Sequence, residues 1–132
     1  MSNQQDQVES KGDKAQVGLS IDGNDHIEHL TKVHKWFETG IDAYRVAVAL
    51  AIARGMQESD LKMPKQRTTK YGVGSIDESG KLREMIVTLR PELSDRPYAH
   101  SEWLAEIGLS IIRNELEEGK YLSEIISEGA KP

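Results

Sequence analysis

Residues 16–55 read QVGLSIDGNDHIEHLTKVHKWFETGIDAYRVAVALAIARG, and they contain the strongest fold signal in the chain. The first six residues alternate between apolar and small or polar side chains, which predicts a short strand buried on one face. Two apolar patterns at helical spacing follow, separated by a Thr-Gly pair. The stretch therefore predicts a strand at about 16–21, a helix, a tight turn and a second helix.

The ends of these two helices are predicted from capping residues. Asn and Asp within 22–25 can accept hydrogen bonds from the exposed amides of a helix start, so the first helix is predicted over about 25–38. Thr39 and Asp42 have the spacing of a capping box, which starts the second helix directly afterwards. Its alanine-rich apolar face continues to Gly55, and a glycine is a common helix end.

The rest of the chain predicts a mostly α single domain. Residues 1–15 have almost nothing to bury and are predicted to be a disordered tail. Residues 16–128 are predicted to form one helical domain with a short N-terminal β-strand. Within this domain, residues 56–80 are polar and are predicted to be a long basic loop.

Three further helices are predicted from apolar stripes at 82–89, 100–117 and 121–126. One alternative stays open, because short apolar runs separate poorly into helix and strand. In that alternative, residues 71–76 and 82–88 pair as a β-hairpin.

Composition excludes several classes of protein. Only 37% of the 132 residues are hydrophobic and one is Phe, so the core must be built mainly from aliphatic side chains. The absence of cysteine excludes disulfides, thiolate metal sites and cysteine nucleophiles. The longest apolar run, 46–53, is too short to cross a bilayer, and the N-terminus has no secretory pattern. We therefore expect a soluble cytoplasmic protein with no membrane partner.

Charge is concentrated in one segment that is a candidate nucleic-acid contact. The chain has a net charge of −5, but residues 54–90 contain eight basic and five acidic side chains. Clustered cations can neutralise backbone phosphates, and an adjacent aromatic ring can stack on a base or sugar. A solvated loop is the alternative interpretation. The candidate residues lie in a stretch without an acid and are Lys62, Lys65, Arg67, Lys70 and Tyr71.

Histidines at the first helix are the only candidates for a metal site. His26 and His29 are three residues apart, so both could face one side and hold a divalent ion with a carboxylate such as Glu28. His34 follows nearby. The spacing matches no known zinc signature, so we expect ordinary surface histidines and no metal or other cofactor.

No catalytic arrangement has a local signature, and we expect that the protein is not an enzyme. The acidic residues of the C-terminal helices are scattered and are predicted to form a solvated face; they are Glu106, Glu115, Glu117, Glu118, Glu124 and Glu128. Trp103 lies in an apolar stripe and is predicted to be core. Trp36 lies beside its stripe and is predicted to pack in or near the core, with partial exposure at a partner-subunit contact as the alternative.

The order of elements in 16–55 resembles the ribbon-helix-helix fold. The resemblance implies that strands of two copies pair and enter the DNA major groove, with Gln16, Gly18 and Ser20 facing the bases. It also implies that the start of the second helix, at Thr39 and Gly40, binds a phosphate. This strand contains no Arg or Lys, and glycine has no side chain, which favours backbone contact over base reading.

Two further stretches resemble the small accessory proteins of DNA phosphorothioation (Dnd) systems. Residues 30–55 share the helix, the Thr-Gly turn and the Ala/Leu-rich helix with an early arginine, Arg45. Residues 105–112 resemble the terminal helix of some relatives. The resemblance implies DNA association within a bacterial DNA-modification or phage-defence system, without enzymatic activity.

The sequence thus predicts a non-catalytic, DNA-associated accessory protein that contacts the DNA backbone through its basic loop. The alternative is a protein–protein adaptor without nucleic-acid binding, which docks on a larger protein complex. A homo-oligomer is expected as well, because a single strand with unpaired amides is satisfied by pairing with a second copy.

Overall fold

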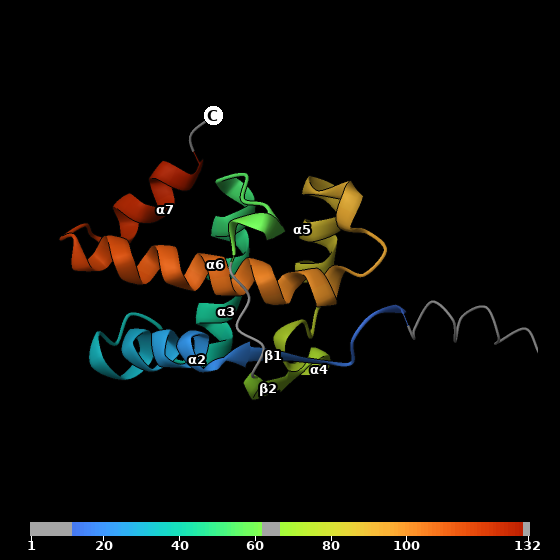
Figure 1. Cartoon of the computed structure of the whole chain (residues 1–132), viewed down its shortest axis with the longest axis horizontal. Helices are drawn as coiled ribbons and strands as arrows, with labels where there is room; N and C mark the ends of the chain where they lie inside the picture. The colour runs from blue at the N-terminus through green and yellow to red at the C-terminus, as the bar shows by residue number, and fades with distance from the viewer. Residues whose placement is uncertain (1–11, 62–66, 131–132) are drawn as a thin grey trace, which may run out of the picture.

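Two helices that cross each other form the centre of the fold (Figure 1). The computed structural model describes residues 12–61 and 67–130, with backbone only at 67–70 and 129–130. The helices α3 (Gly40–Ala53) and α6 (Pro97–Glu117) make the most extensive contact between any two described elements. The other elements pack around this pair, which confirms a mostly α protein with a short N-terminal strand.

The remaining elements are one pair of strands, several shorter helices and three short helical turns. In chain order they are β1 (Gln16–Ser20), α2 (Ile21–Glu28), the π-helical turn η1 (His29–Val33), the 3-10 turn η2 (Glu58–Asp60), β2 (Arg67–Gly72), α4 (Val73–Ile76), α5 (Lys81–Leu89), the 3-10 turn η3 (Pro91–Leu93) and α7 (Leu122–Ala130).

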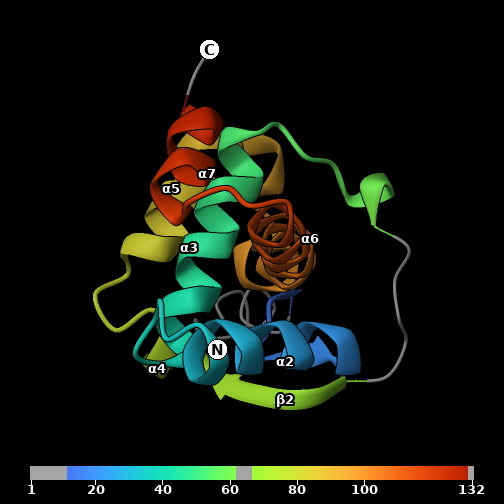
Figure 2. The same ribbon diagram turned by 90° about the vertical axis from the view of Figure 1, so that its left-hand side faces the viewer.

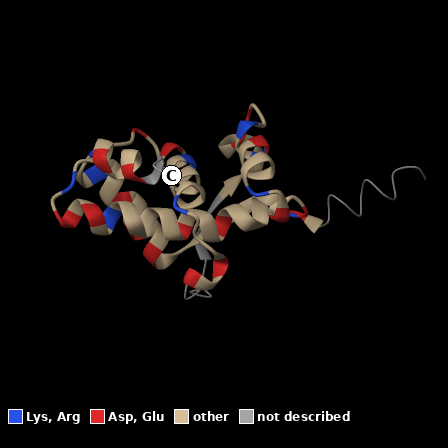
Figure 3. Ribbon diagram, turned by 90° about the horizontal axis from the view of Figure 1, so that it is seen from above, with Lys and Arg blue, Asp and Glu red and all other residues tan. Residues whose placement is uncertain are grey.

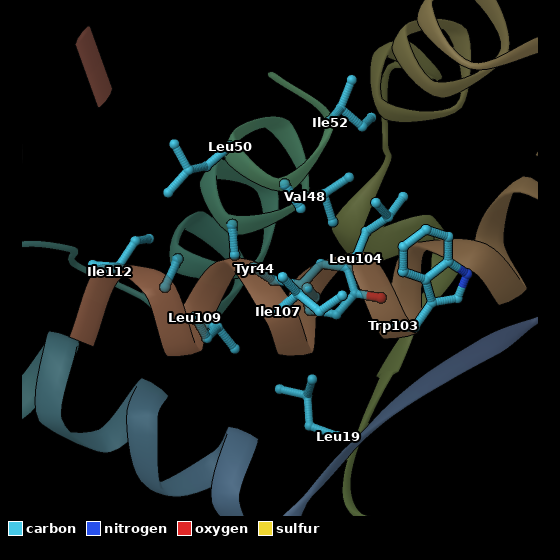
Figure 4. Close-up of a cluster of buried hydrophobic side chains, with 14 of the residues drawn as sticks. Leu19, Tyr44, Val48, Leu50, Ile52, Trp103, Leu104, Ile107, Leu109 and Ile112 are labelled. Atoms are coloured by element: carbon cyan, nitrogen blue, oxygen red, sulfur yellow. The ribbon is translucent and has the colours of Figure 1, made fainter. Parts of the chain in front are cut away.

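The core is largely aliphatic, as the composition predicted. Buried Leu, Ile, Val and Ala side chains from α3 and α6 face each other, joined by Leu19 from β1 (Figure 4). The two helices are close because Gly108 of α6 lies directly against the backbone of Ala47 in α3. A side chain at Gly108 would overlap the carbonyl group of Ala47, so this crossing requires glycine.

The first helix begins earlier than predicted. Ser20, the last residue of β1, is its N-cap, and its Oγ accepts a hydrogen bond from the amide of Gly23 at 3.0 Å. The predicted capping stretch 22–25 therefore lies inside α2. The helix then widens into η1 and ends at Val33, before Lys35 adopts a left-handed conformation with φ of 59°. The predicted end at 38 was wrong.

The other helices follow their predictions closely. The Oγ1 of Thr39 accepts a hydrogen bond from the amide of Asp42 at 3.1 Å, and Gly55 has a φ of 68° directly after α3. The helices predicted at 82–89, 100–117 and 121–126 are confirmed as α5, α6 and α7, with small differences at their ends. The alternative hairpin is wrong because its second strand is the helix α5.

The sheet consists of β1 and β2, which are antiparallel, with Val17 opposite Tyr71 and Leu19 opposite Thr69. Residues 67–72 were predicted to belong to the loop at 56–80, and this part of the prediction was wrong. The segment has little apolar alternation of its own, and β1 supplies the hydrogen-bonding partners that make it a strand.

The predicted disordered tail ends earlier than residue 15. The carboxylate of Asp13 accepts hydrogen bonds from the amides of Tyr98 and Ala99, at 3.0 and 2.9 Å, and so caps the start of α6. Residues 1–11 of the predicted tail lie outside the described residues. Across 12–61 and 67–130, no helix combines the length and the apolar character that a bilayer crossing needs.

Candidate nucleic-acid interface

The predicted basic site lies partly outside the described residues. Lys62 and Lys65 precede β2 and are not described, whereas the backbones of Arg67 and Lys70 belong to β2. Among the described strands, only β1 pairs with β2, so β2 is the outer strand of the sheet (Figure 2). The chain therefore leads the basic segment into a strand at the surface of the molecule.

Tyr71 is the best-described residue of the predicted site, and its ring belongs to the packing beneath β2. The side chain is half-buried, and its ring meets the ring of Tyr44 edge-on at a centroid distance of 6.0 Å. The hydroxyl lies so close to Gly40 that an added Cβ there would be 2.5 Å from it. Burial, and next the charge of Glu28, raise the pKa of Tyr71. Its ring is therefore only partly accessible for stacking on a base.

Strand β1 does not have the exposure that the ribbon-helix-helix resemblance implied. Gly18 and Ser20 are buried, and their amides donate to two carboxylates on α6. The Gly18 amide lies 2.7 Å from Glu102 Oε2, and the Ser20 amide lies 2.6 Å from Glu106 Oε2. With β2 on one edge and these carboxylates on the other, β1 cannot pair with a second copy or face DNA bases. The unpaired strand that suggested a homo-oligomer is thus already paired within the chain.

The carboxylate pair was missed by sequence reasoning. Glu106 was predicted to be on a solvated face, yet only 4% of it is exposed, and its Oε1 also accepts from Ser20 Oγ at 2.9 Å. Glu102 is balanced by Lys14, whose Nζ lies 2.7 Å from Oε1. The available signal was their spacing of four residues on the apolar face of α6, which puts both carboxylates over the same strand.

A second acidic residue of the predicted solvated face also has a partner that is mostly withdrawn from solvent. Glu115 forms a two-pronged ion pair with Arg54 at the end of α3, and Arg54 donates to the carbonyl of Ile125 at 3.1 Å. The hydrogen bond from Arg54 and its charge hold the pKa of Glu115 below its usual range. This contact joins α3, α6 and α7 at one end of the molecule. Figure 3 shows the acidic positions that recur along α6 and α7.

The histidines that suggested a metal site surround an arginine instead. Arg113 of α6 places Nη1 3.1 Å from His26 Nδ1 and Nη2 3.2 Å from His29 Nε2. His34 is elsewhere, with its ring 5.3 Å from that of Trp36. Within the described part of the chain, no three metal-ligating side chains are grouped around one point.

The prediction of a core position is confirmed for Trp103 and wrong for Trp36. Trp103 is 4% exposed, and its Nε1 donates to His100 Nδ1 at 3.1 Å. Trp36 is 38% exposed at the turn between η1 and α3. The first residue therefore belongs to the core, and the second is partly open to solvent.

A shallow groove of about 390 Å³ lies between α3, α4 and α5, and its lining includes Asp77, which caps α5. Asp77 accepts hydrogen bonds from the amides of Leu82 and Arg83, at 2.8 and 2.9 Å, and from the hydroxyl of Tyr98 at 2.6 Å. Burial alone would raise the pKa of Asp77, but these three hydrogen bonds together lower it. Arg45 donates to the carbonyl of Ile76 at 2.7 Å. The groove thus holds a cap for α5.

Replacing Tyr98 with phenylalanine tests this cap. The change removes one of three hydrogen bonds to a buried carboxylate, so the free energy of unfolding should fall by about 1–2 kcal/mol in urea titrations. Tyr121→Phe is the matched control, because Tyr121 is 73% exposed and should change stability very little. Equal, negligible effects of the two substitutions would contradict the role of Tyr98.

Comparison of the chain with protein-family models, with curated proteins and with solved structures found no match in any of the three. The functional argument therefore depends on the residues and contacts described above.

Proposed function

We propose that this protein is a DNA-associated accessory protein without catalytic activity of its own, which contacts the DNA backbone through its basic segment, residues 62–70. The observation that carries the proposal is the run of four cations without an acid that leads into the outer strand β2. By its resemblance to Dnd accessory proteins, we place it in a bacterial DNA-modification or defence system. DNA is the proposed partner.

The distribution of charge supports contact through this segment and no other. Residues 91–132 contain nine acidic and four basic side chains, so α6 and α7 repel a phosphate backbone (Figure 3). The basic segment has the opposite sign and is continuous with a strand whose partner, β1, is fixed to α6. A duplex approaching the molecule would therefore be oriented with its backbone towards the β2 side.

The mode of binding that we propose is insensitive to DNA sequence. The strand that reads bases in the ribbon-helix-helix fold corresponds here to β1, whose Gly18 and Ser20 are buried. Backbone contact by cations carries no sequence information of its own and is strongly weakened by salt. Tyr71, packed on Tyr44, would anchor the end of the contacting strand and would contribute little stacking.

The buried polar groups of the described residues serve the fold. In the part of the chain that the structure describes, every buried side-chain nitrogen and oxygen has a hydrogen-bond partner within the protein. The buried acids with the most contacts, Asp77, Glu102 and Glu106, cap a helix or close a strand edge. Their bonding is therefore accounted for by the fold.

The test is the salt dependence of duplex binding. Wild type and the variant with Lys62, Lys65, Arg67 and Lys70 all changed to Ala are titrated against a labelled duplex, by anisotropy, between about 50 and 200 mM salt. The slope of log K against log salt is negative, and each lost phosphate contact should make it less negative by about 0.9. The loss of four contacts should therefore bring the slope closer to zero by about 3–4. Affinity at the lowest salt should fall at least a hundredfold.

A charge-matched control separates this segment from net charge. Lys62→Ala/Lys65→Ala is compared with Lys32→Ala/Lys35→Ala, because both pairs remove two lysines and residues 32 and 35 are exposed on the turn after α2. The substitutions at Lys62 and Lys65 should make the slope less negative by about 2, and those at Lys32 and Lys35 should leave it unchanged. Equal effects, or no binding by wild type, would reject the proposal and favour the adaptor, whose expected signature is a stable protein partner in a pull-down free of nucleic acid.

A further inference from the structure

Arg113 connects α6 to the N-terminal helix through three side chains. Its Nη1 lies 2.7 Å from Asp25 Oδ2 and 3.1 Å from His26 Nδ1, and its Nη2 lies 3.2 Å from His29 Nε2. Only 18% of the Arg113 side chain is exposed. On its own helix Arg113 also pairs with Glu117 at 3.3 Å. One guanidinium therefore holds both α2 and η1 against α6.

The chemistry of these contacts requires neutral imidazoles. A guanidinium can only donate hydrogen bonds, so His26 Nδ1 and His29 Nε2 must both be unprotonated acceptors. The other ring nitrogen of His29, Nδ1, lies 3.1 Å from the carbonyl oxygen of Asp25 and can donate to it, which agrees with this tautomer. Protonation of either acceptor would replace its hydrogen bond with two positive charges in contact.

We propose that Arg113, Asp25, His26 and His29 form a pH-sensitive latch, which holds α2 and η1 on α6 at neutral pH and loosens in mildly acidic solution, where the imidazole acceptors become protonated. The latch residues lie outside the segment proposed to contact DNA, residues 62–70.

The charges around the histidines set the direction of the effect. Burial, and next the charge of Arg113, lower the pKa of His26 below the 6.5 of an ordinary histidine, although Asp25 and Asp22 act in the opposite sense. Since the folded-state pKa is below the unfolded one, the stabilisation is complete above about pH 6.5 and is lost as the pH falls through the folded-state value. Glu117, on α6, balances part of the charge of Arg113.

The carboxylate in the latch acts at a lower pH. The hydrogen bond from Arg113 lowers the pKa of Asp25 below 3.8, so Asp25 stays ionised throughout the range in which His26 titrates. Loosening of the latch in mildly acidic solution therefore depends on protonation of the imidazole acceptors and not of Asp25, whose ion pair with Arg113 remains. What it would uncover is the apolar face of the same segment, where Ile27 and Leu30 are buried.

Hydrogen exchange measured by mass spectrometry tests the latch on the full chain. Protection of the amides in 21–38 is compared with that in 40–53, at about pH 7.5 and about pH 5.5, after correction for intrinsic exchange rates. We expect protection of 21–38 to fall about tenfold for each unit by which the histidine pKa is displaced, while 40–53 stays unchanged. An equal fall in protection in both segments, or no fall in either segment, would overturn the proposal.

Variants identify the groups responsible. His26→Gln/His29→Gln and Arg113→Met should each remove at least most of the pH dependence, because the first cannot be protonated and the second no longer repels a protonated histidine. His34→Gln is the control and should keep all of it, since the ring of His34 lies beside that of Trp36 and the imidazoles that Arg113 contacts are those of His26 and His29. Loss of pH dependence in the control would refute the assignment.

A measurement on wild type covers the case in which the double variant fails to fold. An NMR titration of the imidazole resonance of His26 should give a midpoint below the 6.5 of an ordinary histidine. A midpoint at or above 6.5 would count against the latch.

Discussion

Gly108→Ala is expected to lower the free energy of unfolding by about 3 kcal/mol. A Cβ at this position would overlap the carbonyl oxygen, carbonyl carbon and Cα of Ala47, and none of these backbone atoms can rotate away. The helices α3 and α6 must separate for the substitution to fit, which opens the core along their crossing. Urea or thermal denaturation measures the loss, with a fall in Tm on the order of 10 °C.

Gly74→Ala is the matched control for this prediction. Gly74 lies in α4 and lacks a left-handed backbone, and a Cβ added there would meet no neighbouring atom within 4 Å. Alanine at this position should therefore leave stability within about 0.5 kcal/mol of wild type. A Gly108→Ala protein as stable as Gly74→Ala would show that the helices can separate without cost. The role of the close crossing would then be wrong.

Glu106→Leu is expected to destabilise the protein by about 3 kcal/mol. The substitution keeps roughly the same volume but leaves two donors of Ser20, the amide and the hydroxyl, buried without their acceptor. Each unsatisfied buried donor costs about 1–3 kcal/mol. Because the same serine caps α2, the loss should also increase hydrogen exchange at the start of that helix.

A graded series distinguishes lost hydrogen bonds from lost packing at this site. Glu106→Gln keeps one acceptor oxygen for the Ser20 amide and should cost about half as much as Glu106→Leu. Glu118→Gln is the control, because Glu118 is exposed and directly follows the end of α6. This substitution should leave the free energy of unfolding nearly unchanged. If Glu106→Leu were as stable as wild type, the carboxylate would not be closing the edge of β1, and strand pairing through that edge would again be possible.

These variants affect the scaffold, whereas the proposed DNA contact should be separable from it. The four-alanine variant of the basic segment leaves every residue of α3 and α6 unchanged, and we expect it to lose duplex affinity while its unfolding midpoint stays near that of wild type. Gly108→Ala should have a lower unfolding midpoint than wild type. At temperatures where it remains folded, it should keep the duplex affinity of wild type. This contrast distinguishes loss of the binding surface from loss of the fold.

Local signals predicted the helices well. Thr39 and Asp42 cap α3 as their spacing indicates, Gly55 follows its end, and α5, α6 and α7 occupy the apolar stripes. Each of these features depends on residues three or four apart, so it can be recognised without knowledge of the rest of the fold. The start of α2 was misplaced because Ser20 was assigned to the strand, and its second role as a cap is visible only in three dimensions.

The candidate site was predicted only in part. The basic residues are apparent from composition, since a run of four cations without an acid needs no structure to be found. Tyr71 was paired with them by adjacency in sequence, but its ring packs towards Tyr44, which lies on α3 far from it in the chain. Sequence adjacency could not show which way the ring turns, because that depends on the register of β2 against β1.

By itself, the sequence determined the helical class, the caps and stops of its main helices and the place of its positive charge, because these follow from neighbouring residues. Only the tertiary structure decided that β2 is a strand, that Glu106 closes β1 from 86 positions away, and that Arg113 lies among three residues of the N-terminal helix. Such contacts have no local signature, since a buried glutamate and a solvated one look the same until α6 is placed over the strand.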